Sequence, residues 1–296
     1  MENDHSEKIG PACPACLAPA TKFFCRKNNC DLYRCSSCRL VFVSPLPTET
    51  ASIYEGDYFS GAEKGFGYVS YDEDKKTMAG IFNDYLQKLE QLNDGRPGHL
   101  LDVGAATGYF LGLAKPRGWT GAGLEISDYA AAKGRAKGLD VKTGILGPDL
   151  FPPGSFDVVS MWDVIEHVRE PKKDLQTVAG LLHPGGALVI NTPNGASWTA
   201  RILGSRWHLL VPPEHLHYFN PRALSLLLQQ SGFKVLSVHY PGKVFTLEYI
   251  FHTLARWQGL SLWQKILSWL KRHPSVGQWG LPINLRDNML IYARKN

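Results

Sequence analysis

Four cysteines near the start of the chain have the spacing of a metal site. They form two Cys-x-x-Cys pairs, Cys13 with Cys16 and Cys35 with Cys38. Paired thiolates at this spacing close a tetrahedral zinc site and leave no position open for catalysis. A module this small lacks a hydrophobic core, so metal binding would supply its folding energy. The pattern therefore predicts a structural zinc ion in a zinc-ribbon-like module over residues 11–43.

The two remaining cysteines, Cys25 and Cys30, lie inside the same module. They are interpreted as buried free thiols, and roles as alternative ligands or part of a second site stay open. No cysteine follows Cys38, and the first ten residues contain no apolar run that could act as a secretory signal. Disulfides are therefore disfavoured, and a cytoplasmic, reducing location is expected. The chain also has no run of about 18 apolar residues that would predict a membrane-spanning helix.

A second group of residues lies at 100–110, where the apolar segment LLDV runs into the turn GAATG. Gly104 and Gly108 would let the backbone bend sharply and approach a ligand without a Cβ in the way. Asp102 could hold a polar group or organise the amides of the loop. The third glycine that brings a dinucleotide's pyrophosphate close to the backbone is missing. S-adenosylmethionine carries no phosphate, so this looser turn suits it.

An acidic residue at the end of the next predicted strand supports the same cofactor. Glu125 ends the segment GAGLE, and a carboxylate at that position can accept hydrogen bonds from both hydroxyls of a ribose. The alternative is an ordinary strand–helix turn with a solvated Glu125. The loop, the acid and the surrounding alternation of strands and helices together favour a cofactor site.

These side chains need a scaffold, and from His99 the chain alternates segments typical of strands and helices. Such alternation predicts an α/β fold with a doubly wound, mostly parallel sheet. The predicted strands are 99–103, 120–125, 139–143, 156–161, 187–192, 233–240 and 288–294. The predicted helices are 72–92, 108–117, 127–137, 172–183 and 221–231. We divide the chain into the zinc module, a helical linker and lid at 44–98, and a cofactor domain at 99–296 with insertions at about 193–220 and 242–287.

Residues 99–192 resemble the class I S-adenosylmethionine-dependent methyltransferases. The resemblance rests on Leu101-Asp102-Val103-Gly104 with Gly108, Gly123-Leu124-Glu125, Ser155-Phe156-Asp157-Val158-Val159, Asp163-Val164-Ile165-Glu166-His167 and Leu182-His183-Pro184-Gly185-Gly186. It implies a Rossmann-like sheet of seven strands, with the last strand antiparallel beside the fifth. It also implies cofactor contacts, with two tyrosines as lid residues. The expected set is Asp102, Gly104, Ala105, Gly108, Tyr109, Phe110, Glu125, Ile126, Ile145, Trp162, Asp163 and His167, with the lid residues Tyr68 and Tyr71.

One position departs from the family pattern. Many relatives carry an acidic residue just after the third strand to meet the adenine amino group, whereas this chain has Gly144 followed by Ile145 and Leu146. We therefore expect apolar packing and backbone groups to hold the adenine.

The insertion after the fifth predicted strand contains the segment PPEHLHYF. Glu214 and His215 are predicted to be a general-base pair above the transferable methyl group. The alternative is that His215 and His217 pack the lid and cap the next helix. A zinc module before such a domain resembles a subset of methyltransferases that act on sugars and other biosynthetic molecules. Those on sugars have a similar Glu-His but favour a tyrosine where this chain has Pro212, which weakens a sugar C-methylation reading.

We expect a small-molecule acceptor, namely a sugar, a polyketide-like or a lipid-linked compound, methylated on oxygen or carbon. The alternative is an RNA methyltransferase whose zinc module grips phosphates. The basic residues for that role are Lys22, Arg26, Lys27, Arg34 and Arg39. A NAD(P) oxidoreductase and a non-catalytic zinc scaffold are less favoured. The net charge of +5 permits an anionic partner without requiring one. Apolar residues at helical spacing over 244–272 indicate a membrane-surface helix, core packing or a homodimer face.

Overall fold

The computed structural model describes residues 10–48, 75, 78–248, 251–252, 261–277 and 279–296. The predicted lid residues Tyr68 and Tyr71 lie outside the described residues. Of the helix predicted over 72–92, the structure shows α3 at Ala79–Leu92, with Phe82, Leu86 and Leu89 buried.

A seven-stranded sheet forms the centre of the molecule, in the order β10-β13-β8-β7-β4-β5-β6. The strands β4 to β8 run parallel to one another. The last strand, β13, lies between β8 and β10 and is antiparallel to both. This topology confirms the predicted doubly wound α/β fold and the position of the last strand. The strands are β4 (His99–Val103), β5 (Thr120–Glu125), β6 (Val141–Thr143), β7 (Phe156–Trp162), β8 (Leu182–Pro193), β10 (Phe233–His239) and β13 (Asn288–Lys295).

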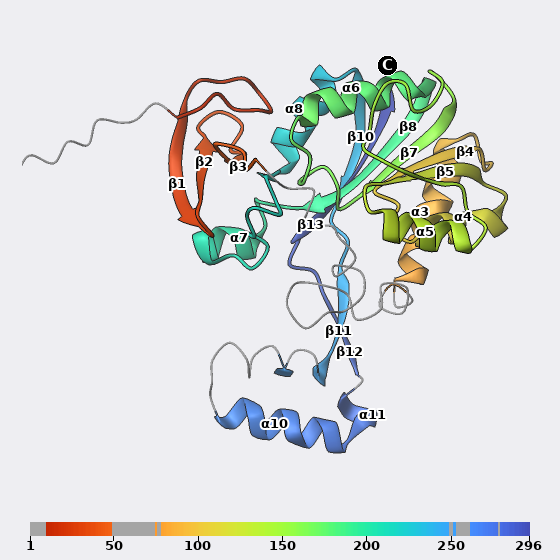
Figure 1. Ribbon diagram of the computed structural model, residues 1–296. Helices are drawn as coiled ribbons and strands as arrows, with labels where there is room; N and C mark the ends of the chain where they lie inside the picture. Colours follow the sequence, from red (N-terminus) through yellow and green to blue (C-terminus); the bar gives the residue numbers. More distant parts are fainter. Residues whose placement is uncertain (1–9, 49–74, 76–77, 249–250, 253–260, 278) are drawn as a thin grey trace, which may run out of the picture.

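Helices cover both faces of this sheet (Figure 1). Helices α6 and α8 pack on one face around Leu175, Leu224 and Ile190, and α3, α4 and α5 cover the other around Phe82 and Phe110. The remaining bounds are α4 (Tyr109–Ala114), η2 (Lys115–Arg117), α5 (Asp128–Ala136), α6 (Pro171–Leu181) and α8 (Pro221–Gln230).

The boundary between α6 and β8 differs from the prediction. Helix α6 ends at Leu181, and β8 already begins at Leu182. Pro184 explains the difference, because a proline disfavours helical geometry in the residue before it, here His183. The chain therefore leaves the helix early and reaches the sheet sooner than the apolar run 187–192 indicates.

The cysteine-rich module forms a second, four-stranded sheet in the order β1-β2-β3-β9. Its strands are β1 (Thr21–Lys27), β2 (Cys30–Cys35), β3 (Val41–Val43) and, from far along the chain, β9 (His217–Tyr218). Asn28 and Asn29 join β1 to β2 with φ of 48° and 61°. Positive φ at two successive turn residues matches the twist of a two-residue hairpin, and asparagine tolerates it. We call β1, β2, β3 and their cysteine-bearing turns the ribbon.

The insertion after β8 packs against the ribbon. It contains α7 (Trp198–Leu203), η3 (Gly204–Arg206) and β9. A hydrophobic cluster joins Leu32 and Val41 of the ribbon to Trp207, Leu216 and Tyr218 of the insertion.

We call the segment 243–286 the appendage, and its described residues form a third unit that stands away from the central sheet (Figure 1). A two-stranded sheet of β11 (Lys243–Thr246) and β12 (Gly280–Ile283) leads to α10 (Ser261–Arg272) and α11 (Pro274–Gly277). Among the described residues, no helix is long and apolar enough to cross a membrane.

Candidate functional site

The glycine turn after β4 has the conformation that its sequence requires. Gly104 and Gly108 have φ of +74° and +75°, where side-chain-bearing residues are strained. A Cβ on Gly104 would lie 2.4 Å from Val164 Cγ2, and one on Gly108 would lie 2.5 Å from Leu139 Cδ1. The turn therefore fits tightly between its neighbours, and only glycine satisfies both the space and the backbone conformation.

Glu125 fastens this turn to the end of β5. Its side chain is 5% exposed, and its Oε2 accepts a hydrogen bond from the Ala106 amide at 2.8 Å. Its Oε1 accepts another from the Ser127 amide, also at 2.8 Å. Burial raises the pKa of this carboxyl above its ordinary value. Each oxygen still has a lone pair that a ligand hydroxyl can use.

Asp102 lies beneath the turn and is 1% exposed. Its Oδ1 accepts a hydrogen bond from the Ser160 hydroxyl at 2.6 Å. Burial raises the pKa of Asp102 to about 7. The structure thus places this carboxyl as a support of the loop, with a partner on β7 that the sequence pattern did not identify.

A cavity of about 550 Å³ opens beside these groups at the carboxyl ends of β4, β5, β6 and β7. This is the edge at which open α/β sheets bind their ligands. Seven of the predicted cofactor residues line it: Gly104, Glu125, Ile126, Ile145, Trp162, Asp163 and His167. The lining also includes residues that the sequence prediction missed. Those are Lys75, Val103, Ala106, Leu124, Pro148, Met161, Val164, Val168, Arg169, Glu170, Lys173, Asp174 and Thr177, while Gly144 and Leu146, which flank Ile145 in the segment expected to hold the adenine, also line the cavity.

Other predicted cofactor residues lie away from this lining. Phe110 is 3% exposed and packs on Trp162, with ring centroids 4.8 Å apart. The ring of Tyr109 lies beside that of Phe82, with the centroids 6.2 Å apart. Ala105 and Gly108 belong to the turn but do not line the cavity. These side chains hold the loop and helix α4 against the core, and their predicted cofactor contacts stay predictions.

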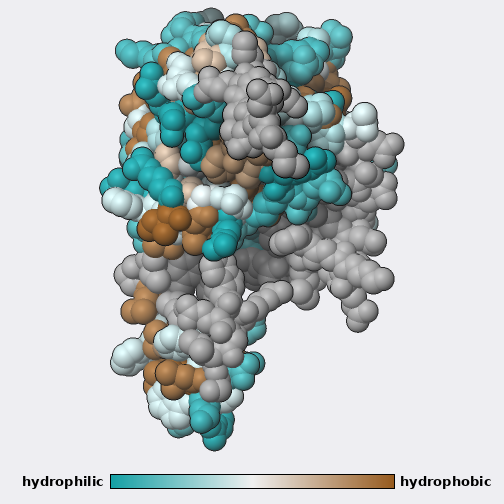
Figure 2. All heavy atoms as spheres, turned by 90° about the vertical axis from the view of Figure 1, so that its left-hand side faces the viewer, coloured by the Kyte–Doolittle hydropathy of each residue, from teal (hydrophilic) through white to brown (hydrophobic). Residues whose placement is uncertain are grey.

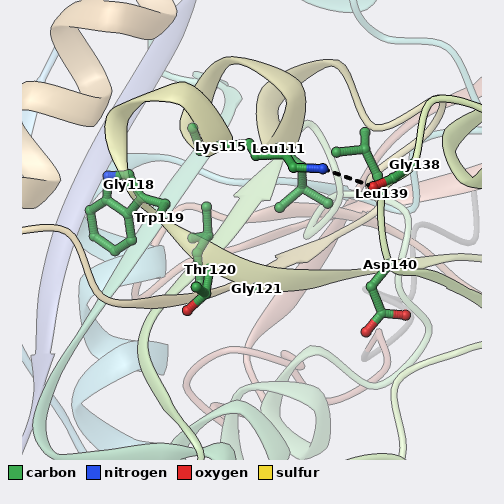
Figure 3. A pocket seen from close by; sticks show the side chains of 11 residues that line it. Leu111, Lys115, Gly118, Trp119, Thr120, Gly121, Gly138, Leu139 and Asp140 are labelled. Atoms are coloured by element: carbon green, nitrogen blue, oxygen red, sulfur yellow. Dashed lines mark hydrogen bonds between the residues drawn. The ribbon is translucent and has the colours of Figure 1, made fainter.

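A second cavity, of about 460 Å³, lies near Trp119, Thr120 and Asp140 (Figure 3). It adjoins the start of β5, at the amino end of the parallel strands, and shares no lining residue with the first cavity. Lys115 crosses it, and its Nζ donates a hydrogen bond to the Gly138 carbonyl at 3.1 Å. Nothing in its geometry assigns it a ligand.

Three titratable side chains converge next to the first cavity. Glu166, His167 and His215 each bring one potential ligand atom within 4.8 Å of the others. His167 lines the cavity, and its ring lies edge-on to that of His215 with the centroids 4.7 Å apart. The Nε2 of His167 lies 3.9 Å from Oε1 of Glu166. The predicted base His215 therefore lies beside His167 and outside the cavity lining.

Hydrogen bonds fix the tautomers of both imidazoles. The Nδ1 of His167 donates to the Glu214 carbonyl at 2.8 Å, and the Nδ1 of His215 donates to the Leu209 carbonyl at 3.1 Å. Each ring therefore carries its lone pair on Nε2. Burial lowers the pKa of His167, and burial together with the neighbouring His167 lowers the pKa of His215 to about 3. Both rings are neutral at physiological pH.

The two carboxyls of this region differ in their surroundings. Glu166 is 1% exposed, and its Oε2 accepts a hydrogen bond from the Thr192 hydroxyl at 2.9 Å. Burial and the nearby Asp163 raise its pKa well above the ordinary value. Glu214 is half-buried, which also raises its pKa. His217 is fully buried in β9, and burial lowers its pKa to about 4.

The ribbon supports the loop that carries His215. Strand β9 pairs with β3, and the Val43 amide donates to the Leu216 carbonyl at 2.9 Å. Asn28 Nδ2 donates to the Pro212 carbonyl at 2.7 Å. On the other side of β9, the amides of Leu216 and His217 both donate to the Glu166 carbonyl. A continuous set of backbone contacts thus connects the ribbon with the cluster.

The four predicted metal ligands of the ribbon come together. Sγ of Cys13 lies 3.5 Å from Sγ of Cys38, and Sγ of Cys16 lies 3.5 Å from Sγ of Cys35. A tetrahedral zinc with bonds of about 2.3 Å would place its sulfur atoms about 3.8 Å apart, so the donor set and its spacing suit this ion. Cys25 and Cys30 do not join this group and instead pack against the cluster shared with the insertion.

Comparison with known proteins places this geometry in a family. A family model described as a methyltransferase domain matches residues 75–238, more than half of the chain. The ubiquinone biosynthesis O-methyltransferase of Thiobacillus denitrificans is 26% identical over 146 residues, 45% of this chain and 63% of that protein. The protein of the same name from Xanthomonas euvesicatoria pv. vesicatoria is 30% identical over 92 residues, 29% of this chain and 38% of that protein. The chain thus spans less than two thirds of the length of these relatives.

Solved structures agree on the fold. A SAM-dependent methyltransferase from Archaeoglobus fulgidus has a TM-score of 0.54 at 18% identity, covering 80% of this chain and 99% of that one. A protein from Bacillus halodurans, assigned as a methyltransferase, has a TM-score of 0.51 at 18% identity, covering 71% and 98%. At this identity the likeness concerns the fold alone.

Proposed function

The chain belongs to the methyltransferase-domain family, and from that premise we propose that it uses S-adenosylmethionine to methylate a hydroxyl group of a small biosynthetic molecule. The observation that carries this proposal is one cavity lined by Gly104, by Glu125 and by the neutral imidazole of His167. The same cavity thus contains residues that suit a nucleoside, Gly104 and Glu125, and a residue that can accept a proton, His167.

The residues around the cavity fit the cofactor. Glu125 has lone pairs left for two ribose hydroxyls. Ile126 and Ile145 are 39% and 71% exposed and offer apolar surface to an adenine ring. When bound, S-adenosylmethionine supplies an electrophilic methyl group. The enzyme's own task is then to place an acceptor oxygen in line and to remove its proton.

His167 is the residue we assign to proton removal. Its Nδ1–H is committed to the Glu214 carbonyl, so only Nε2 can accept a proton. Oε1 of Glu166 lies 3.9 Å from Nε2, so an imidazolium at His167 would favour the ionised form of this buried carboxyl and would be stabilised by it. The predicted pair Glu214 and His215 then has a positioning role. The backbone carbonyl of Glu214 fixes the tautomer of His167, and the His215 ring packs edge-on against the His167 ring and fixes its orientation.

A hydroxyl acceptor is favoured over carbon for two reasons. A neutral imidazole is a suitable proton acceptor for an oxygen nucleophile. The curated relatives are named as O-methyltransferases, although they match over only part of their length. We therefore propose the chemical class of the acceptor, and the sugar, polyketide-like and lipid-linked compounds expected from the sequence remain candidates within it.

We also propose that the four ribbon thiolates hold a structural zinc ion. The ion would fix the turns at Cys13–Cys16 and Cys35–Cys38, and thereby the ribbon. Strand β3 pairs with β9, and β9 is hydrogen-bonded to the backbone of Glu166. The zinc would therefore stabilise, from a distance, the position of Glu166 and of the two histidines beside it, His167 and His215.

The contacts of the ribbon support a small molecule over RNA. The Arg34 guanidinium lies 4.0 Å from the centroid of the Phe24 ring, and Arg26 forms an ion pair with Asp31 at 3.6 Å. Lys27 lies 3.5 Å from the carbonyl oxygens of Ser205 and Trp207. At least three of the five basic residues expected to grip phosphates thus have partners within the protein. We therefore expect this protein to bind RNA weakly, without the steep salt dependence of a protein that contacts many phosphates.

The direct test has two parts. Calorimetric titration should show S-adenosylhomocysteine binding to the purified chain and a large loss of affinity in Glu125→Gln. Transfer of a labelled methyl group to a panel of phenols, sugars and lipid-linked alcohols should then depend on His167. His167→Gln should lower kcat, whereas the matched variant His239→Gln, at an exposed position of β10, should not.

Two results would overturn the proposal. Binding of NADH without binding of S-adenosylhomocysteine would remove the cofactor assignment. Metal analysis distinguishes a proton-accepting His167 from a metal-binding one, because the proposal expects one zinc per chain, held by the ribbon. A second bound metal ion that is lost in His215→Gln would make His167 a metal ligand in place of a proton acceptor.

A further inference from the structure

The charge of this chain is unevenly distributed. The appendage, residues 243–286, contains six lysines and arginines and a single acidic residue, Glu248. Its excess therefore equals the whole formal net charge of +5, and the rest of the chain is balanced. The same segment holds four of the eight tryptophans. A basic, tryptophan-rich unit is thus attached to an otherwise neutral enzyme.

Helix α10 presents an apolar edge with basic side chains next to it. Leu262 and Trp269 are 58% and 45% exposed, whereas Leu270 is buried. At about 100° per residue, Leu262 and Trp269 lie about 20° apart around the helix. Lys265 and Arg272 lie about 40° and 60° from Trp269 on the polar side. The exposed edge is therefore apolar in the middle and positively charged along one border.

Neighbouring residues extend this apolar surface. Trp279 is 65% exposed, and Leu281 and Leu285 are each 44% exposed. Figure 2 shows apolar side chains at the surface of the lobe that projects from the body of the molecule. Figure 1 places α10 at the far end of the β11–β12 pair, away from the central sheet. These side chains are thus not part of the core that holds the cofactor cavity.

We propose that the appendage docks the enzyme on an anionic lipid surface. Trp269, Leu262 and Trp279 would insert at the level of the headgroups, and Lys265 and Arg272 would bind lipid phosphates. The twelve residues of α10 are too few to span a bilayer, which needs about 20, so the helix lies in the plane of the surface.

Charge complementarity selects this occupant over a second copy of the chain. Two appendages placed face to face would oppose one net charge of +5 to another, which disfavours their association. An anionic surface instead gains from each lysine and arginine and accommodates exposed tryptophan and leucine together. The inference stands on the appendage alone and does not need the identity of the methyl acceptor.

Sedimentation of the full chain with lipid vesicles tests this. We expect binding to vesicles that contain phosphatidylglycerol, little binding to pure phosphatidylcholine, and loss of binding as salt is raised to about 0.5 M. Lys265→Glu and Arg272→Glu should each lower partitioning at least about five-fold. Trp269→Ser should weaken binding at low salt as well.

Matched variants outside the appendage provide the controls. Trp198→Ser removes a tryptophan that is 62% exposed on α7, and Lys88→Glu reverses a charge on α3 whose ammonium group bonds Gln91 in an exposed position; neither should change partitioning. S-adenosylhomocysteine binding by each variant reports whether it is folded. Equal binding of the unaltered chain to neutral and anionic vesicles would overturn the proposal, as would equal losses in the controls. A dimer that Trp269→Ser dissociates, without lipid binding, would show that the edge is an interface between copies.

Discussion

Gly104→Ala tests the reasoning about the cofactor loop most directly. The new Cβ would lie 2.4 Å from Val164 Cγ2, at a backbone φ of +74°. The left-handed conformation costs a side-chain-bearing residue about 1–2 kcal/mol, and forcing an extra methyl group into a packed site costs about 1–3 kcal/mol. We therefore expect the free energy of unfolding to fall by about 2–5 kcal/mol.

The same substitution should weaken cofactor binding. Val164 also lines the cavity, so relieving the clash moves its side chain into the space of the ligand. A misfit of about 1.4 kcal/mol already lowers affinity tenfold, and we expect at least that loss for S-adenosylhomocysteine. Denaturant unfolding and calorimetric titration measure the two effects on one protein preparation.

Two further variants make this prediction specific. Gly112→Ala, in helix α4, has no atom within 4 Å of the new Cβ and should leave stability unchanged or raise it by up to about 1 kcal/mol. Val164→Ala combined with Gly104→Ala should recover the steric part, giving a coupling energy of about 1–3 kcal/mol. A coupling energy near zero, or Gly104→Ala with unaltered binding, would refute the argument.

Three other predictions concern the metal, a histidine and a buried acid. Cys38→Ser should release zinc and lower both the melting temperature and kcat, as measured by metal analysis and the methyl-transfer assay; retention of one zinc per chain would contradict this. Because burial lowers the pKa of His167, its neutral form persists below pH 6.5, and the acidic limb of kcat/KM should lie below that value; a limb centred at 6.5 or above would disagree. Burial raises the pKa of Asp102 to about 7, so its contribution to stability is complete below about pH 4 and is lost as the pH rises through about 7. The melting temperature of Asp102→Asn minus that of the unaltered chain should therefore be larger at pH 8.5 than at pH 5. An equal difference at both pH values would count against the burial argument.

The parts of this fold that sequence predicted well are local. Strand β4, the turn at Gly104 and strand β5 with Glu125 are adjacent in the chain, and each follows from apolar runs and glycine geometry within a few residues. The pattern also predicted the final strand β13, but its place in the sheet needed the family resemblance, because its neighbours β8 and β10 belong to other parts of the sequence and no spacing fixes the order of strands.

The parts that were missed depend on contacts between distant residues. Ser160 supports Asp102 only because β7 lies beside β4. Glu166 gains its role from Thr192 and from the insertion that covers it, which the short motif around it does not reveal. Phe110 follows the glycine turn as a cofactor residue would, yet the turn of helix α4 directs it toward Trp162.

Pairing of β9 with β3 has a consequence for how the protein forms during translation. The edge of β3 cannot be completed until residues 217–218 have left the ribosome, although β3 itself lies at residues 41–43. Until then Leu32 and Val41 lack the cover of Trp207 and Tyr218. Nascent chains that end before the insertion should therefore expose this apolar edge and be susceptible to proteolysis, so the ribbon becomes protected only after strands β4 to β8 of the central sheet have been synthesised.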